Sequence, residues 1–195
     1  MTPINIESSI IKLGTEAVLR YRTISAATSD SELPEVFLGG FIASRLYDEI
    51  QCPIHIERPY MKMAAELGIS TDGELKRRIE LQRADMAVYQ GGRPSHIVEF
   101  KIFDEGTGVD KIVDDLKKAR ELADRKPISI ALGLMICETS SLPLESRIKR
   151  LESALNSPLA CGERQSSADW HWCFACYSQN AVKPGLDVEK FLGEL

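Results

Sequence analysis

No apolar run in this chain is long enough to form a membrane-spanning helix, which requires roughly 20 consecutive apolar residues. The longest candidate covers residues 128–137 and fits a buried strand better. The first residues also lack a basic segment followed by an apolar one, which is the mark of a secretory signal peptide. These absences lead us to expect a cytoplasmic protein.

Cysteine is scarce, odd in number and irregularly spaced, with five residues in the whole chain. In a cytosolic protein such residues are usually reduced and packed as small apolar groups. His171, Cys173 and Cys176, with Cys161 upstream, are residue types that bind zinc, but only one CxxC spacing occurs. Alternation along a strand would place Cys173 and Cys176 on opposite faces, so we favour packed thiols over a zinc site.

Several catalytic signatures are also missing. The chain has no Gly-rich phosphate loop, no Ser/His/Asp signature and no dinucleotide-binding fingerprint. Its net charge of -5 argues against a general nucleic-acid coat, because such proteins are normally basic. A nuclease remains compatible with this charge, since a metal site requires acidic residues and contact with phosphates can rely on a local patch.

What is present is an ordinary globular composition. The chain has 195 residues, of which 44% are hydrophobic and 27% charged. A chain of this size can bury a core without disulfides or a structural metal. We therefore expect one domain spanning residues 1–195.

Hydrophobic periodicity divides the chain into helices and strands. The predicted helices cover residues 8–24, 35–50, 110–125, 145–155 and 188–192. The predicted strands cover residues 53–60, 84–90, 95–103, 128–138 and 170–177. The polar insertion between the first two strands, residues 61–82, is expected to be partly helical.

The order of these elements predicts an α/β fold with a central mixed sheet flanked by helices. From Glu35 onward the order is helix, three strands, helix and strand, followed by a C-terminal αβα extension. Gly91-Gly92 predicts a tight hairpin turn between the second and third strands. Gly39-Gly40 either weakens the second helix or marks a place where another element packs closely.

The segment from Ile97 to Phe103 contains two charged residues in an otherwise apolar strand. Glu99 and Lys101 project from the same face because side chains alternate along a strand. Burying two charges in a central strand costs free energy and seldom serves the fold. A cross-strand salt bridge on a half-exposed sheet is the structural alternative, but we favour a functional site.

Asp85 is expected to join this pair, since the hairpin brings the start of one strand beside the end of the next. Asp85 and Glu99 would supply the hard oxygen ligands that Mg²⁺ prefers. Lys101 could orient or help to deprotonate an attacking water and stabilise charge on a phosphoryl group. The three residues together favour a metal-dependent phosphodiesterase.

These residues resemble the motifs of the PD-(D/E)XK nuclease superfamily, whose members share the restriction-endonuclease-like fold. Arg83-Ala84-Asp85 stands at the first acidic motif, with Ala84 where the family usually has proline, and Glu99-Phe100-Lys101 matches the (D/E)XK triplet. The resemblance covers the αβββαβ order over residues 35–138, a little over half of the chain.

The resemblance implies a DNA endonuclease that uses Mg²⁺ or Mn²⁺. Asp85, Glu99 and the Phe100 carbonyl would hold the metal, and Lys101 would position the water. A homodimer is compatible with cutting two strands. DNA versus RNA, sequence specificity and biological role are left open by the residues.

An acidic residue of the first core helix often joins the site in that superfamily. A helix that leads antiparallel into the first strand places its N-terminus near Asp85, which favours Glu35 over Asp48 and Glu49. Glu57 on the first strand is a second candidate. Glu35 could equally be a first-turn carboxylate that offsets the helix dipole.

Two further alternatives follow from the same residues. The chain could keep the fold as a catalytically inactive nucleic-acid-binding or assembly protein. The basic run Lys76-Arg77-Arg78 with Arg83, and also Lys111, could contact phosphates. A solvated helix paired with Glu74 and Glu80 explains the run equally well. His55 and His96 are expected to be ordinary sheet residues.

Overall fold

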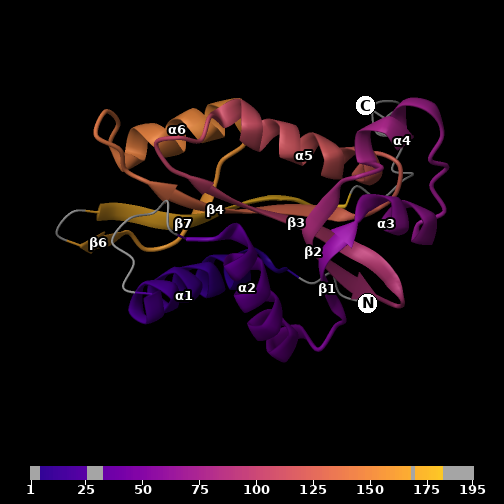
Figure 1. Ribbon diagram of the computed structural model, residues 1–195, viewed down its shortest axis with the longest axis horizontal. Helices are drawn as coiled ribbons and strands as arrows, with labels where there is room; N and C mark the ends of the chain where they lie inside the picture. Colours follow the sequence, from indigo (N-terminus) through magenta and orange to yellow (C-terminus); the bar gives the residue numbers. More distant parts are fainter. Residues whose placement is uncertain (1–4, 26–32, 168–169, 182–195) are drawn as a thin grey trace, which may run out of the picture.

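The computed structural model describes residues 5–25, 33–167 and 170–181. In this part of the chain, seven strands form one open mixed sheet flanked by helices (Figure 1). The helices are α1 (Glu7–Ser25), α2 (Glu35–Ile50), α3 (Tyr60–Glu66), α4 (Gly73–Ile79), α5 (Val109–Ala123) and α6 (Leu144–Leu155). The strands are β1 (Ile54–Pro59), β2 (Arg83–Gln90), β3 (Arg93–Phe103), β4 (Ser129–Cys137), β5 (Ala160–Cys161), β6 (Gln165–Ser167) and β7 (Trp170–Gln179).

The strands are arranged in the order β1-β2-β3-β4-β7-β5, and β6 also pairs with β7. β3 and β4 run parallel, whereas the other pairs are antiparallel. A parallel connection requires a long crossover, and α5 provides it between β3 and β4. This crossover places α5 over the face of β3 that carries Glu99 and Lys101.

Two apolar cores lie on the two faces of the sheet. In Figure 1, α1 and α2 cover one face, and α5 and α6 cover the other. Alternate residues of β3 enter different cores: Ile97 faces the α5 and α6 side, and Val98 faces the α1 and α2 side. Burial on both faces explains why β3 and β4 have nearly continuous apolar sequences.

Most predicted elements are confirmed, including α2, whose bounds match the expected helix. Gly91 and Gly92 form the hairpin turn with φ values of 58° and 77°, a conformation that glycine adopts without steric cost. The prediction that Tyr60 ends a strand is wrong, because Tyr60 begins α3 after Pro59. A helix can begin directly after a proline, so β1 ends at Pro59 and α3 begins at Tyr60.

The C-terminal extension is more complex than the predicted αβα arrangement. β5 and β6 were not predicted, because strands of two and three residues are too short to produce a period. The expected helix over residues 188–192 lies outside the described residues.

Close packing involves other glycines than the pair in α2. A Cβ atom on Gly133 would lie 2.7 Å from the ring of Phe100, and one on Gly14 would lie 2.3 Å from the ring of Phe174. Gly40 has nothing within 4 Å, and Gly39 has only an ordinary contact at 3.7 Å. Of the two alternatives for Gly39-Gly40, unusually close packing is therefore not the one observed, and α2 continues through both glycines. Among the described residues, no helix combines the length and apolarity needed to cross a membrane.

Candidate functional site

Asp85 lies on β2 where the strand loses regular pairing with both neighbours. The ladder between β2 and β3 ends at Met86 and Val98. On the other side, the register skips Glu57, which has a φ of 50°. The Asp85 carboxylate turns toward β3, and its Oδ2 accepts a hydrogen bond from the Phe100 backbone N–H at 2.7 Å. A carboxylate thus replaces the backbone acceptor that a continued ladder would supply.

Glu99 lies on the adjacent strand and is only 5% exposed. Tyr60, the first residue of α3, donates a hydrogen bond from its hydroxyl to Glu99 Oε1 at 2.5 Å. Burial, together with the charge of Glu99, raises the pKa of Tyr60 well above its ordinary value. The phenol therefore keeps its proton and acts as a donor that orients the Glu99 carboxyl group.

The carboxyl group of Glu99 lies in surroundings that oppose its ionisation. Burial raises the pKa of Glu99 to about 8, and the charge of Asp85 adds to this effect. Burial also raises the pKa of Asp85, although the Phe100 hydrogen bond counteracts it. Glu99 in turn lowers the pKa of Asp85, so that the two groups favour ionisation of Asp85 over ionisation of Glu99. At neutral pH Glu99 therefore keeps its proton in the absence of a cation. A cation bound between the two carboxyl groups could take the place of that proton.

Lys101 is held by carboxylates from two helices. Its Nζ lies 2.8 Å from Glu35 Oε2 and 3.4 Å from Asp115 Oδ2. Burial works against the charged amine, but Glu35 and Asp115 outweigh it and raise the pKa of Lys101. Asp115 also accepts from Lys118 at 2.6 Å. Lys101 is consequently a fixed ammonium group at neutral pH.

Glu35 reaches the cluster as the topology predicts. It is the first residue of α2, and its carboxylate contacts Lys101 across the end of the sheet. Glu49, at the other end of the same helix, instead accepts hydrogen bonds from Ser9 and Lys12. The structure therefore brings together Glu35 and Lys101 and leaves Glu49 apart.

Glu57 lies at the border of the cluster. Its backbone carbonyl accepts a hydrogen bond from Arg83 at 3.1 Å, and its side chain is exposed. It lines a shallow hollow beside the cluster, together with Glu35, Val36, Gly39, Gly40, Ile56 and Asp85. The absence of side chains at the two glycines leaves this approach to Asp85 open.

Asp85 and Glu99 are the carboxylates of the cluster that could offer oxygen atoms to a small cation. Each carboxylate has one oxygen bound by the protein, Oδ2 of Asp85 by Phe100 and Oε1 of Glu99 by Tyr60. Mg²⁺ commonly uses one or two carboxylates and completes its shell with water. Within the described ranges, no group of three or more His, Cys, Asp or Glu residues is arranged to hold a metal. Among the described residues, the cluster therefore offers these two carboxylates and no larger ligand group.

Sequence reasoning missed Tyr60 and Asp115. Tyr60 was assigned to a strand, so the hydroxyl contact with Glu99 could not be anticipated. Asp115 is one of several charged residues on the amphipathic helix α5, and no local pattern distinguishes it from Asp114. The only available signal was that α5 follows the strand that carries Glu99.

The basic run on α4 is largely engaged in ion pairs. Arg78 pairs with Glu74 and Glu121, and Lys76 pairs with Glu80. This arrangement favours the solvated-helix interpretation of the run. Exposed ion pairs contribute little free energy, so they do not prevent these residues from contacting an anion.

The histidines within β1 and β3 occupy ordinary sheet positions. His55 packs with its ring 4.7 Å from that of Tyr89. His96 is buried and its Nδ1 lies 3.0 Å from Ser95 Oγ.

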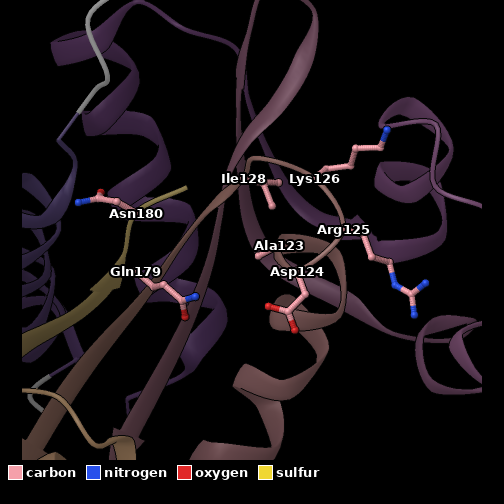
Figure 2. A pocket seen from close by; sticks show the side chains of 7 residues that line it. All are labelled: Ala123, Asp124, Arg125, Lys126, Ile128, Gln179 and Asn180. Carbon is pink, nitrogen blue, oxygen red and sulfur yellow. The ribbon is translucent and has the colours of Figure 1, made fainter. Parts of the chain in front are cut away.

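A second cavity of about 310 Å³ lies between the end of α5, the start of β4 and the end of β7. Its lining residues are Ala123, Asp124, Arg125, Lys126, Ile128, Gln179 and Asn180 (Figure 2). In Figure 2 the side chains of Arg125 and Lys126 extend away from Gln179. This cavity therefore does not gather its charged groups around one point.

No protein-family model, curated protein or solved structure matches this chain. The resemblance to the PD-(D/E)XK superfamily therefore remains a prediction from the residues quoted above. The geometry of the cluster is the basis for a functional proposal.

Proposed function

We propose that this chain is a metal-dependent nuclease with a restriction-endonuclease-like core, which hydrolyses phosphodiester bonds, in DNA as the resemblance implies. The observation that carries the proposal is the buried carboxyl group of Glu99 beside the partly buried carboxylate of Asp85, with the ammonium group of Lys101 on the same face of the sheet. A buried acidic pair destabilises a fold unless a cation or a proton offsets it. Such an arrangement is typical of a site selected for chemistry.

Asp85 and Glu99 would hold Mg²⁺ or Mn²⁺ through the oxygens that Phe100 and Tyr60 do not bind. The Phe100 carbonyl would add a third oxygen, since its N–H already contacts Asp85. The metal would supply Lewis-acid polarisation of the phosphate and a lower pKa for a bound water. Tyr60 keeps the Glu99 carboxylate in place during exchange of the proton for the cation.

Lys101 would act as a positioned cation. Its raised pKa favours hydrogen-bond donation to the attacking water and stabilisation of phosphoryl charge over proton abstraction. Glu35 and Asp115 restrict the amine to one place, which lowers the entropy lost when substrate binds. The sequence left two roles open for Lys101, namely deprotonation of the water and stabilisation of charge. The proposal assigns it the stabilisation of charge.

The test is cleavage of plasmid and oligonucleotide substrates with Mn²⁺, with EDTA as the metal-free comparison. Lys101→Met should lower the cleavage rate by about 100-fold or more, because the loss of one positioned donor that stabilises developing charge has an effect on that scale. Lys149→Met is a matched control, since Lys149 is an exposed lysine of α6. Equal rates in both variants, or cleavage that persists in EDTA, would contradict the proposal.

A catalytically inactive nucleic-acid-binding protein is the second candidate. The observation that favours it is that the described residues offer two carboxylates and no larger metal-holding group. Binding of DNA or RNA without cleavage under any metal would support this candidate. The nuclease proposal includes a homodimer, because cutting two strands requires two active sites. Analytical ultracentrifugation tests for the dimer.

A further inference from the structure

Cys161 and Cys173 form a thiol pair at the edge of the sheet, away from the carboxylate cluster. β5 is the edge strand, and Cys161 lies opposite Ala175 in its ladder with β7. Side chains two positions apart on one strand share a face, so Cys173 is a diagonal neighbour of Cys161. The two thiols lie close enough for each to shift the pKa of the other, that of Cys161 downward and that of Cys173 upward.

The two cysteines differ in exposure. Cys161 is exposed, and Cys173 is 1% exposed within the core beneath α5 and α6. Cys176, also on β7, belongs to the opposite core with α1 and α2. Cys173 and Cys176 therefore lie on opposite faces of β7, as expected from strand alternation. Cys161 lies on the same face of the sheet as Cys173.

We propose that Cys161 and Cys173 are an oxidisable pair that closes to a disulfide on reaction with a small disulfide oxidant such as oxidised glutathione. Cys161 is the attacking thiol because it is exposed, and Cys173 is the resolving thiol because it lies against it. This modification site does not depend on the proposed nuclease activity.

The surroundings favour the attacking thiolate at Cys161. The neighbouring thiol of Cys173 lowers the pKa of Cys161, and Arg164 acts in the same direction, whereas burial and Glu152 oppose it. The pKa of Cys173 is raised by its contact with Cys161 and by burial. Once Cys161 is in a mixed disulfide, it no longer carries the thiolate charge that opposes ionisation of Cys173.

The exchange balances without another reagent. The Cys161 thiolate attacks one sulfur of the oxidant and releases a glutathione thiolate, which takes up the proton that Cys161 lost. Cys173 then loses its proton and attacks the Cys161 sulfur, which releases the second glutathione as a thiol. The chain loses two hydrogen atoms and gains one S–S bond, while the oxidant is reduced to two thiols.

β5 has to move slightly for the bond to form, because Cβ atoms joined by a disulfide lie about 3.8 Å apart and diagonal neighbours lie farther. A strand of two residues at the sheet edge has few hydrogen bonds to restrain it. Gly162, whose N–H donates to the Phe174 carbonyl at 2.8 Å, provides a fixed point directly after Cys161. The displacement is therefore confined to β5.

Peptide mapping of the full chain after incubation with oxidised glutathione tests the proposal. Trypsin cleaves after Arg164, so Cys161 and Cys173 leave on separate peptides unless a disulfide joins them. We expect a joined peptide, and fragmentation should place the link at Cys173 rather than Cys176. A stable glutathione adduct on Cys161, or a link to Cys176, would overturn the proposal.

Alkylation by iodoacetamide at neutral pH provides a second measurement. Cys161 should react several-fold faster than Cys52, a partly exposed thiol outside the pair. The advantage should shrink in Cys173→Ala, because the neighbouring thiol that lowers the pKa of Cys161 is removed. Equal rates for Cys161 and Cys52 in the unmodified chain would overturn the proposal, whether or not the variant folds.

Discussion

Glu99 carries a carboxyl group in surroundings that oppose its ionisation. Its ordinary pKa is 4.5, and burial beside Asp85 raises the value to about 8 in the folded chain. The folded protein therefore binds this proton more tightly than the unfolded protein does. The consequence is a stability that depends on pH in the opposite direction from an ordinary salt-bridged carboxylate.

The metal-free chain should lose stability as the pH rises from about 5 to about 8, and the loss should level off above that range. The unfolded state ionises Glu99 near its ordinary pKa while the folded state still retains the proton. Urea unfolding in EDTA across this range measures the change in unfolding free energy. Glu99→Gln should remove most of the slope, and the raised pKa of Asp85 should leave a smaller slope of the same sign. Identical slopes in the two proteins would show that Glu99 is not the titrating group.

Tyr60 orients Glu99 without contributing a charge. Tyr60→Phe removes only the hydroxyl that donates to Glu99 and should weaken Mn²⁺ binding by roughly 10-fold to 100-fold, as expected when the partner of a metal ligand is lost. Isothermal titration with Mn²⁺ at neutral pH measures this effect. Tyr89→Phe is the control, because the Tyr89 hydroxyl contacts Arg58 and Glu66. Equal affinity losses in both variants would indicate a general structural effect.

At the scale of elements, the packing of helices against the sheet depends on where glycine is placed. Gly14 on α1 lies against the Phe174 ring of β7, and Gly40 on α2 faces open space. Both residues lie inside helices, so alanine has the same effect on helix propensity at each. The difference between the two positions therefore reports on tertiary packing.

Gly14→Ala should destabilise the chain by about 1–3 kcal/mol, because the new methyl group would overlap the Phe174 ring. Gly40→Ala should instead stabilise it by up to about 1 kcal/mol through helix propensity. Urea unfolding of both variants measures the difference. A gain in stability for Gly14→Ala would show that α1 shifts readily on the sheet.

Element prediction succeeded where periodicity was long and failed where it was short. The helix over residues 35–50 and the hairpin at Gly91-Gly92 were predicted from spacing and turn chemistry. Tyr60 was misassigned because an apolar aromatic residue after a strand continues the alternating pattern. β5 and β6 were missed because their pairing with β7 is determined by tertiary contacts.

At the scale of the whole molecule, the site is assembled from four separate elements. Glu35 comes from α2, Asp85 from β2, Glu99 and Lys101 from β3, and Asp115 from α5. A site of this kind exists only in the folded chain. A metal that binds it should therefore stabilise folding.

Mn²⁺ should raise the thermal unfolding temperature of the chain, by an amount equivalent to about 2.7 kcal/mol at 100 times the dissociation constant. Asp85→Asn should remove most of this stabilisation, since it deletes one of the two carboxylates. Glu57→Gln is the matched control, because Glu57 borders the cluster but is exposed. Thermal scans with and without the metal measure the shift. An unchanged shift in Asp85→Asn would place the metal elsewhere.

The sequence by itself determined the order of the main elements and the proximity of Asp85 to Glu99 and Lys101. Local rules suffice for this, because strand alternation fixes which side chains share a face and a glycine turn fixes the hairpin register. The expectation for Glu35 required one topological step, namely that α2 runs antiparallel into β1.

Only the tertiary structure decided how the charged groups are held. The ladder ends at Met86, which frees the Asp85 carboxylate to bind the Phe100 N–H. Tyr60 reaches Glu99, and Asp115 reaches Lys101, because α3 and α5 pack over the same face of β3. Such contacts depend on how helices settle on a sheet, and the spacing of residues along the chain does not encode them.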